Sequence, residues 1–241
     1  MDSPFHSEQI GWPTYLDIVW AGMVTAALVL GAGVIAQTGP VLHIIAAALF
    51  SSMAGLLLRF WPAGRDFGWA NRATLLRGSL VITLISLAPF ADVLGLWLWL
   101  YGVLCLLALI LDGVDGAIAR KTQSQTAFGA RFDMELDALF ILGLCITVIA
   151  LDKAGWWVLL LGLMRYAFVI AGHLLPFLND PLPDSFRRKT VCVWQVATLM
   201  VAVLPPASPG FATWTLAAAL ILLVYSFATD MHWLYQRRTP I

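Results

Sequence analysis

Apolar residues occur along the chain in long runs that short polar segments separate. A helix that crosses a bilayer needs about 20 mostly apolar residues, and eight runs approach this length. We therefore predict an all-α integral membrane protein with about eight transmembrane helices. Seven of the predicted helices lie near 16–37, 40–60, 93–120, 128–151, 154–177, 189–204 and 210–235. The third in chain order begins within 59–77 and ends near 89.

The composition favours a membrane protein over a soluble one. Of the 241 residues, 61% are hydrophobic and only 12% are charged, whereas a soluble domain carries roughly 25% charged residues. The formal net charge is +0, so no overall charge attracts nucleic acid. The three cysteines lie inside apolar runs, which argues against a disulfide framework and against a zinc site.

Positive charges fall almost entirely on one side of an eight-helix topology. Of the 14 Lys and Arg, only Lys153 lies on the opposite side, and Arg165 lies inside a helix. Because cytoplasmic loops carry the excess of Lys and Arg, we predict a multi-pass protein of the bacterial inner (cytoplasmic) membrane with both termini in the cytoplasm. The remaining twelve are Arg59, Arg65, Arg72, Arg77, Arg120, Lys121, Arg131, Arg187, Arg188, Lys189, Arg237 and Arg238.

Four aspartates cluster where the fourth predicted helix ends and the fifth begins. Asp112 and Asp115 are three residues apart and share one helix face, while Asp133 and Asp137 are four apart and share another. The short loop between the two helices makes them antiparallel neighbours, so the four carboxylates are expected to converge. Glu135 lies about 200° around its helix from Asp133 and is excluded from the cluster. The site would open to the cytoplasm.

Converging carboxylates repel one another unless cations neutralise them. Oxygen ligands without His or Cys select Mg²⁺ or Mn²⁺ over zinc, and two such ions are a common device for displacement at phosphorus. Gly113, Gly116 and Gly129 leave room for a ligand, and Arg120 offers a bidentate phosphate contact. A single helical aspartate also fits a cap, and Asp133 fits a residue that simply starts its helix.

The order Asp112-x2-Asp115-Gly116-x2-Ala119-Arg120-x8-Gly129-x3-Asp133-x3-Asp137 resembles the signature of the CDP-alcohol phosphotransferase (CDP-alcohol phosphatidyltransferase) family at all eight fixed positions. The resemblance covers roughly residues 70–235. It implies two N-terminal transmembrane helices in 1–62 and a six-helix domain in 63–241.

This resemblance implies an enzyme that transfers a phosphoryl-linked group from a CDP-linked donor to an alcohol and releases CMP. It implies two divalent ions held by Asp112, Asp115 and Asp133. Asp137 would also lie near the metals and act as general base on the acceptor hydroxyl. The cytidine and diphosphate pocket would be lined by Gly116, Ala119, Arg120 and Gly129.

A second, less strict match precedes the aspartates. Asn71, Thr74 and Arg77 share one helix face and resemble the Asn-x2-Thr-x2-Arg opening of the family's first core helix. The resemblance implies contacts to the nucleotide or its phosphates. Thr74 is also explained as an ordinary helix residue, and Arg77 as a cytoplasmic charge that snorkels to the membrane surface.

The acceptor is less constrained than the donor. Arg165, inside the sixth predicted helix, needs an anionic partner, which is either the aspartate cluster or a phosphate on the acceptor. Together with Arg131 and the basic run 187–189 it favours glycerol 3-phosphate or another phosphorylated polyol, although that run is also explained as topology-setting charge. Phospho-inositol, serine or choline would need only different pocket residues. We expect Asp230 to cap its helix or to pair locally with Arg237.

CDP-diacylglycerol is the expected donor, because its tails can stay in the bilayer while CDP enters from water. The mirrored arrangement is a soluble CDP-alcohol with diacylglycerol as acceptor. The expected partners are therefore CDP-diacylglycerol, a small alcohol and membrane lipids, and dimers are common in families that this chain resembles. Alternative hypotheses are an intramembrane prenyltransferase, a proton- or cation-coupled transporter, and an inactive lipid-binding scaffold.

Overall fold

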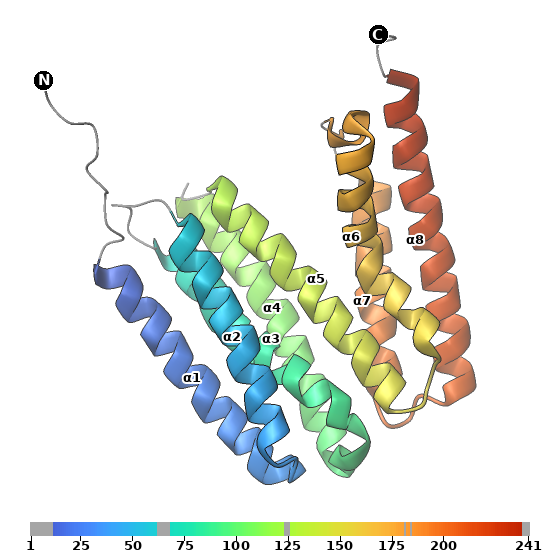
Figure 1. Cartoon of the computed structure of the whole chain (residues 1–241). Helices are drawn as coiled ribbons and strands as arrows, with labels where there is room; N and C mark the ends of the chain where they lie inside the picture. The colour runs from blue at the N-terminus through green and yellow to red at the C-terminus, as the bar shows by residue number, and fades with distance from the viewer. Residues whose placement is uncertain (1–11, 62–67, 123–125, 181, 184, 238–241) are drawn as a thin grey trace, which may run out of the picture. The chain divides into compact units, whose positions relative to one another are not determined.

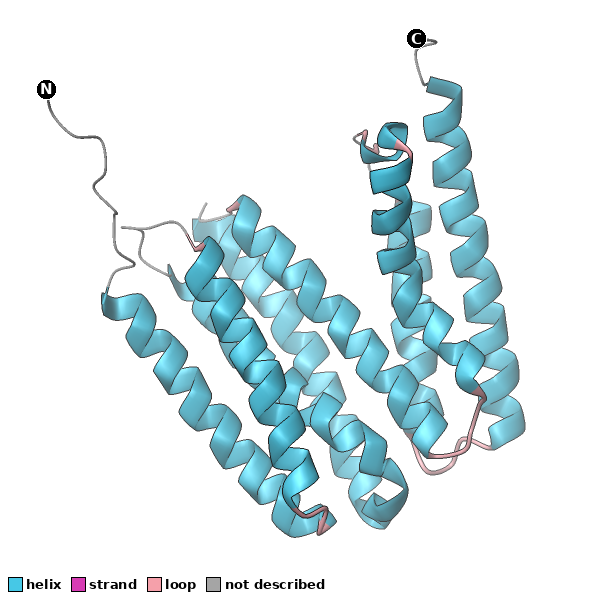
Figure 2. Ribbon diagram, viewed as in Figure 1, coloured by secondary structure: helices cyan, strands magenta, loops and turns pink. Residues whose placement is uncertain are grey.

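The computed structural model describes residues 12–61, 68–122, 126–180, 182–183 and 185–237; within these ranges the side chains of 115, 118–120, 122, 127 and 179 are not described. The described residues are almost entirely helical, with no strand (Figure 2), so the predicted all-α class is confirmed. Figure 1 traces the helices: α1 (Trp12–Ala36), α2 (Pro40–Phe60), α3 (Gly68–Leu87), α4 (Leu98–Thr122), α5 (Ala127–Ala150), α6 (Leu159–Leu174), α7 (Phe186–Val203) and α8 (Pro209–Arg237), with the 3-10 segments η1 (Ala88–Trp97), η2 (Trp156–Val158) and η3 (Pro176–Asn179).

Five segments among the described residues are long and apolar enough to cross a membrane. They are α1, α2, the joined segment Gly68–Val114, Trp156–Leu174 and α8. The joined segment contains both α3 and most of α4, because η1 connects them with little break. The protein is therefore a multi-pass membrane protein, while the predicted count of eight crossings stays a prediction for α5 and α7.

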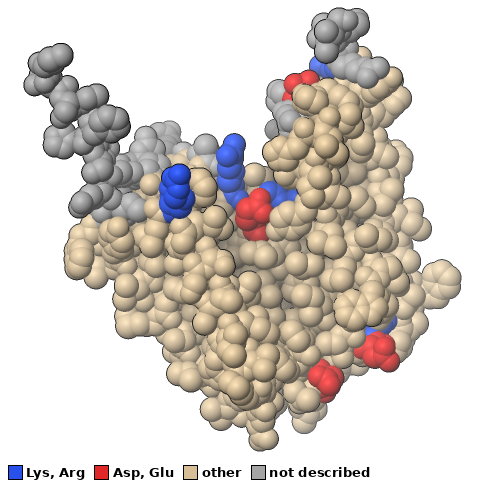
Figure 3. All heavy atoms as spheres, viewed as in Figure 1, with Lys and Arg blue, Asp and Glu red and all other residues tan. Residues whose placement is uncertain are grey.

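The surface is largely apolar, as expected for a protein in contact with lipid. Large apolar side chains are exposed along most helices, for example Val34 at 80%, Leu96 at 87% and Trp214 at 76%. The face drawn in Figure 3 carries few charged side chains, and these form small groups separated by wide uncharged surface. Exposure of so much apolar area is unfavourable in water, whereas contact of the same area with hydrocarbon tails is not.

Two compact units make up the chain: Met1–Leu94 with Val103–Asp137, and Gly95–Gly102 with Ala138–Ile241. In the first unit α3 packs against both α1 and α2. Small residues allow close approach of these helices: a Cβ on Gly78 of α3 would lie 3.1 Å from Met53 Sδ of α2, and, where α1 packs against α2, a Cβ on Gly22 would lie 3.2 Å from the Phe50 ring. Most of α3 is consequently buried.

Polar contacts also join α1 to α3. Arg72 Nε donates to both carboxylate oxygens of Asp17 at 3.0 Å, and its guanidinium lies 5.2 Å from the Trp69 ring centroid. Ser79 Oγ donates to the backbone oxygen of Ala21 at 3.2 Å. The two N-terminal helices are thus packed onto the helix that carries Asn71, Thr74 and Arg77. The predicted domain division between residues 62 and 63 stays a prediction.

In the second unit the basic start of α7 pairs with α8. Arg187 donates from Nη2 to Asp230 Oδ1 at 2.6 Å and from Nη1 to Ser226 Oγ at 2.8 Å, and Arg188 lies 3.4 Å from the same carboxylate. The expectation that Asp230 pairs locally with Arg237 is therefore wrong. Helix–helix packing brings Asp230 to residues 42 and 43 positions away, a relation that local spacing does not reveal.

Lys153, the one cation predicted on the opposite side of the membrane, has a structural role in this unit. Its Nζ donates to the backbone oxygens of Ala202 at 3.0 Å and Leu204 at 2.6 Å. The last carbonyls of a helix lack intrahelical donors and carry partial negative charge. Lys153 therefore caps the C-terminus of α7.

Candidate active site

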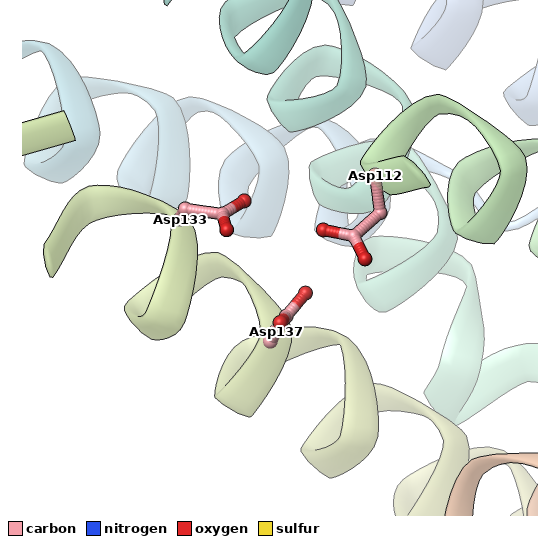
Figure 4. A group of neighbouring side chains, drawn as sticks. All are labelled: Asp112, Asp133 and Asp137. Carbon is pink, nitrogen blue, oxygen red and sulfur yellow. The ribbon is translucent and has the colours of Figure 1, made fainter. Parts of the chain in front are cut away.

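Three of the four predicted aspartates meet in the first unit. Asp112 comes from α4, and Asp133 and Asp137 come from successive turns of α5; their side chains point toward one another (Figure 4). Each offers one carboxylate oxygen, and these oxygens all lie within 4.8 Å of one another. The described structure therefore brings Asp112 together with Asp133 and Asp137, as predicted, while the predicted place of Asp115 on the face of Asp112 stays a prediction.

The guanidinium of Arg77, from α3, lies among these carboxylates. Its Nη1 donates to Asp112 Oδ1 at 2.5 Å and to Asp133 Oδ1 at 2.6 Å. Its Nη2 donates to Asp137 Oδ1. One planar cation thus bridges three acidic groups from two other helices, the fork geometry that arginine provides and lysine does not.

Burial differs sharply across this ion-pair group. The Arg77 side chain is 2% exposed, whereas those of Asp112, Asp133 and Asp137 are 32%, 37% and 48% exposed. A buried guanidinium without carboxylate partners is strongly destabilising, so Arg77 depends on the aspartates, whereas the partly exposed aspartates can also be hydrated by water. The carboxylates form the accessible rim of the site, and Arg77 forms its floor.

The contacts of Arg77 with the three carboxylates are not among those that the sequence predicts. Arg77 was expected to contact nucleotide or to snorkel to the membrane surface, and the structure excludes the snorkelling interpretation because the side chain is almost fully buried. The available signal was the shared face of Asn71, Thr74 and Arg77, which places Arg77 one turn deeper in the helix than Thr74.

The start of α5 is held in place by a short polar network. Thr126 Oγ1 accepts from the backbone N–H of Gly129 at 2.9 Å, an N-cap that satisfies one free donor of the first turn. A Cβ on Gly129 would lie 2.9 Å from Asn71 Oδ1 and 3.0 Å from Thr126 Oγ1. Gly129 is therefore explained here by close packing of α5 against Asn71 of α3. The predicted role in a nucleotide pocket is untested.

The structure describes the positions of only some of the other predicted site residues. Thr74 is buried and its hydroxyl donates to the backbone oxygen of Ala70 at 3.1 Å, which fits an ordinary helix residue. Gly116 lies in α4 and is half-buried. Arg165 lies in α6 of the second unit, with its Nε buried. The side chains of Asp115, Ala119 and Arg120 lie outside the described residues, so their predicted contacts stay predictions.

The donor set suits a hard divalent cation. Asp112, Asp133 and Asp137 present oxygen ligands only, with no His or Cys among the described members of the group. Mg²⁺ and Mn²⁺ prefer carboxylate oxygen, whereas zinc sites usually include His or Cys. The residues present therefore fit the predicted Mg²⁺ or Mn²⁺.

Comparison with known proteins places the site in a family. The model of the CDP-alcohol phosphatidyltransferase family matches residues 67–225, which contain all four aspartates and Arg77. The chain is 28% identical over 153 residues to a CDP-diacylglycerol–glycerol-3-phosphate 3-phosphatidyltransferase of Rickettsia bellii, covering 62% of this chain and 80% of that protein. A protein of the same name from Rickettsia felis is 30% identical over 129 residues, covering 53% of this chain and 71% of its own length.

A shorter similarity reaches a eukaryotic protein. Sixty residues are 40% identical to ethanolaminephosphotransferase 1 of Homo sapiens, covering 24% of this chain and only 15% of the human protein. No solved structure matches the chain. Because the family model spans well over half of the chain and includes the complete aspartate pattern, the chain belongs to the CDP-alcohol phosphatidyltransferase family, a family of transferases.

Proposed function

We propose that this protein transfers a phosphatidyl group from CDP-diacylglycerol to an alcohol and releases CMP. The observation that carries the proposal is the convergence of Asp112, Asp133 and Asp137 from two helices inside the segment that the family model matches. An accessible acidic rim at a membrane helix end suits a substrate with a charged diphosphate and lipid tails.

Asp112, Asp115 and Asp133 are the proposed ligands of two Mg²⁺ or Mn²⁺ ions, with Asp137 adjacent to them. Ions held there neutralise the donor diphosphate and stabilise the charge that develops on the leaving phosphate. Gly116, Ala119, Arg120 and Gly129, with Asn71, Thr74 and Arg77, are the proposed contacts to the cytidine and diphosphate.

Asp137 is the proposed general base. Its side chain is the most exposed of the three described carboxylates, at 48%, which leaves it open to a hydroxyl arriving from water. It accepts the hydroxyl proton while the acceptor oxygen bonds to the phosphorus that carries diacylglycerol. The bond from that phosphorus to the bridging oxygen breaks, and its electron pair leaves with CMP.

Glycerol 3-phosphate is the proposed acceptor. Two relatives carry this substrate in their names. Arg165 is the proposed contact for the acceptor phosphate, because a cation inside an apolar helix needs an anionic partner. The site is proposed to face the cytoplasm, because the aspartates lie on the basic side of the predicted topology.

The reaction is tested with purified protein, Mg²⁺ or Mn²⁺, CDP-diacylglycerol and a panel of alcohols: glycerol 3-phosphate, inositol phosphate, serine and choline. We expect CMP release with glycerol 3-phosphate and a lipid product whose mass is that of the phosphatidyl adduct. The absence of CMP with every alcohol would contradict phosphatidyl transfer. Product with a non-phosphorylated alcohol alone would contradict the acceptor assignment.

The proposed contact between Arg165 and the acceptor phosphate can be tested by substitution. Arg165→Ala removes the proposed cation, so the KM for glycerol 3-phosphate is expected to rise at least ~10-fold, the loss of one charged hydrogen bond, while the KM for CDP-diacylglycerol changes little. Initial rates at varied concentrations of each substrate measure this. Arg188→Ala, which leaves the Arg187–Asp230 pair intact, is the control. An effect of Arg165→Ala on the donor alone would remove Arg165 from the acceptor site.

A further inference from the structure

We propose that Arg77 is the resident counter-cation of the carboxylate site, and that a divalent metal ion enters by displacing its guanidinium from Asp112, Asp133 and Asp137. This inference rests on the metal site of the proposed function and adds that Arg77 and the ion compete for the same carboxylate oxygens. It gives Arg77 a positioning role: it holds the carboxylates together before the ion arrives.

The geometry makes guanidinium and ion alternatives for the same oxygens. Arg77 Nη1 lies 2.5 Å from Asp112 Oδ1 and 2.6 Å from Asp133 Oδ1, so this nitrogen occupies the space between the two carboxylates. Mg²⁺ binds its ligands at about 2.0–2.1 Å. An ion bound to the same pair of oxygens would therefore overlap the nitrogen.

The electrostatics point the same way. Three carboxylates with oxygens within 4.8 Å of one another repel strongly, and the guanidinium of Arg77 brings one positive charge among them. A divalent ion brings twice that charge to the same place. It would also repel a guanidinium that remained in contact with it, so the arriving ion weakens the contacts of Arg77 directly.

Burial explains why the competition matters. Arg77 is 2% exposed and reaches the site from within the helix packing, whereas the carboxylates are open to water. An ion can therefore approach the oxygens from the open side while Arg77 holds them from the inner side. Only molecules whose carboxylate oxygens are free of Arg77 can bind the ion, so the apparent Kd equals the intrinsic Kd divided by the fraction of such molecules.

Removing the guanidinium should consequently strengthen metal binding, which is opposite to the effect of removing a metal ligand. We expect Arg77→Met to lower the Kd for Mn²⁺ at least ~10-fold, the effect of a binding-competent fraction of about one tenth. The same variant should melt at a lower temperature in EDTA and gain more in melting temperature when Mn²⁺ is added, because its carboxylates lack a counter-charge until the ion binds.

The experiment measures free Mn²⁺ by electron paramagnetic resonance during titration of the full chain in detergent micelles. The matched control is Arg72→Met, which removes another α3 arginine whose partner is Asp17; its Kd is expected to equal that of the wild type. Arg77→Lys keeps one charge without the fork and should lower the Kd at least ~3-fold. It carries the test if Arg77→Met does not fold.

The outcomes separate this inference from the proposed function. An unchanged or higher Kd in the Arg77 variants, with Mn²⁺ still bound by the wild type and lost in Asp112→Asn, would overturn the displacement and leave the metal site standing. A wild type that binds no Mn²⁺ would overturn both. Tighter binding in Arg72→Met as well would show a general charge effect and would also overturn the displacement.

Discussion

Gly129, one residue of the signature, lets the Asn71 side chain approach the backbone of α5 closely. A Cβ there would lie 2.9 Å from Asn71 Oδ1, closer than real side chains approach, so Asn71 must move when any larger residue replaces the glycine. We expect Gly129→Ala to raise the KM for CDP-diacylglycerol at least ~3-fold, because Asn71 is a proposed nucleotide contact and a displaced hydrogen bond costs of order 1 kcal/mol. Steady-state rates at varied donor concentration measure the change.

A double variant distinguishes this packing effect from a direct one. In an Asn71→Ala background the 2.9 Å contact is gone and only the Thr126 hydroxyl, at 3.0 Å, stays close to the new methyl group, so adding Gly129→Ala should raise the KM less than it does in the wild type. An equal further loss in both backgrounds would contradict the packing explanation and would favour direct approach of the ligand to Gly129.

Spacing along a helix determines which side chains share a face, and the sequence predicted these relations. The helical repeat places Asp133 and Asp137 on one face, and the structure has Asp112 of α4 beside them. The contact of Arg77 with these carboxylates was not predictable in this way. It depends on which face of α3 meets α4 and α5, and that relation is set by packing between segments 35 to 60 residues apart.

Among the helices, α3 carries the link between the N-terminal pair and the site. Its Arg72 faces α1 through Asp17, and its Arg77 faces the carboxylates. The appended helices therefore cover the outer side of a helix whose inner side forms the floor of the site. This arrangement gives the first two helices a structural role that the sequence alone did not indicate.

The Asp17–Arg72 pair is open to a charge-exchange test. Both side chains are partly exposed, at 21% and 30%, so the pair contributes of order 1 kcal/mol or less. We expect Asp17→Arg to lower the melting temperature by a few degrees through like-charge repulsion with Arg72, and the double variant Asp17→Arg/Arg72→Asp to regain most of it. Thermal unfolding in detergent measures both. A double variant less stable than either single one would contradict a direct α1–α3 pair.

Helix positions were predictable from apolar runs, and helix ends less so. The run near 40–60 coincides with α2, while the predicted interruption between 89 and 93 is instead the 3-10 segment Ala88–Trp97. Gly95 in this segment has φ of 50°, a backbone conformation that glycine adopts without strain. A 3-10 continuation is decided by tertiary packing, which apolar periodicity does not report.

For the whole molecule the distribution of charge predicts the orientation. If the basic side faces the cytoplasm, the C-terminus lies there too. We expect green fluorescent protein fused after Ile241 to fluoresce in a bacterial host and alkaline phosphatase fused at the same place to be inactive. Active phosphatase at this position would reverse the predicted orientation and place the carboxylate rim outside the cytoplasm.

The acidic cluster is proposed to perform metal-dependent transfer with Asp137 as the base. The rate of CMP release from CDP-diacylglycerol and glycerol 3-phosphate, titrated with Mn²⁺ for the wild type and for Asp137→Asn, tests it most directly. We predict release that requires Mn²⁺ or Mg²⁺ in the wild type and falls at least ~10²-fold in the variant, the lower end for loss of a general base. Equal CMP release by the two proteins would contradict the role of Asp137 as the base, and release unaffected by EDTA would contradict the metal dependence.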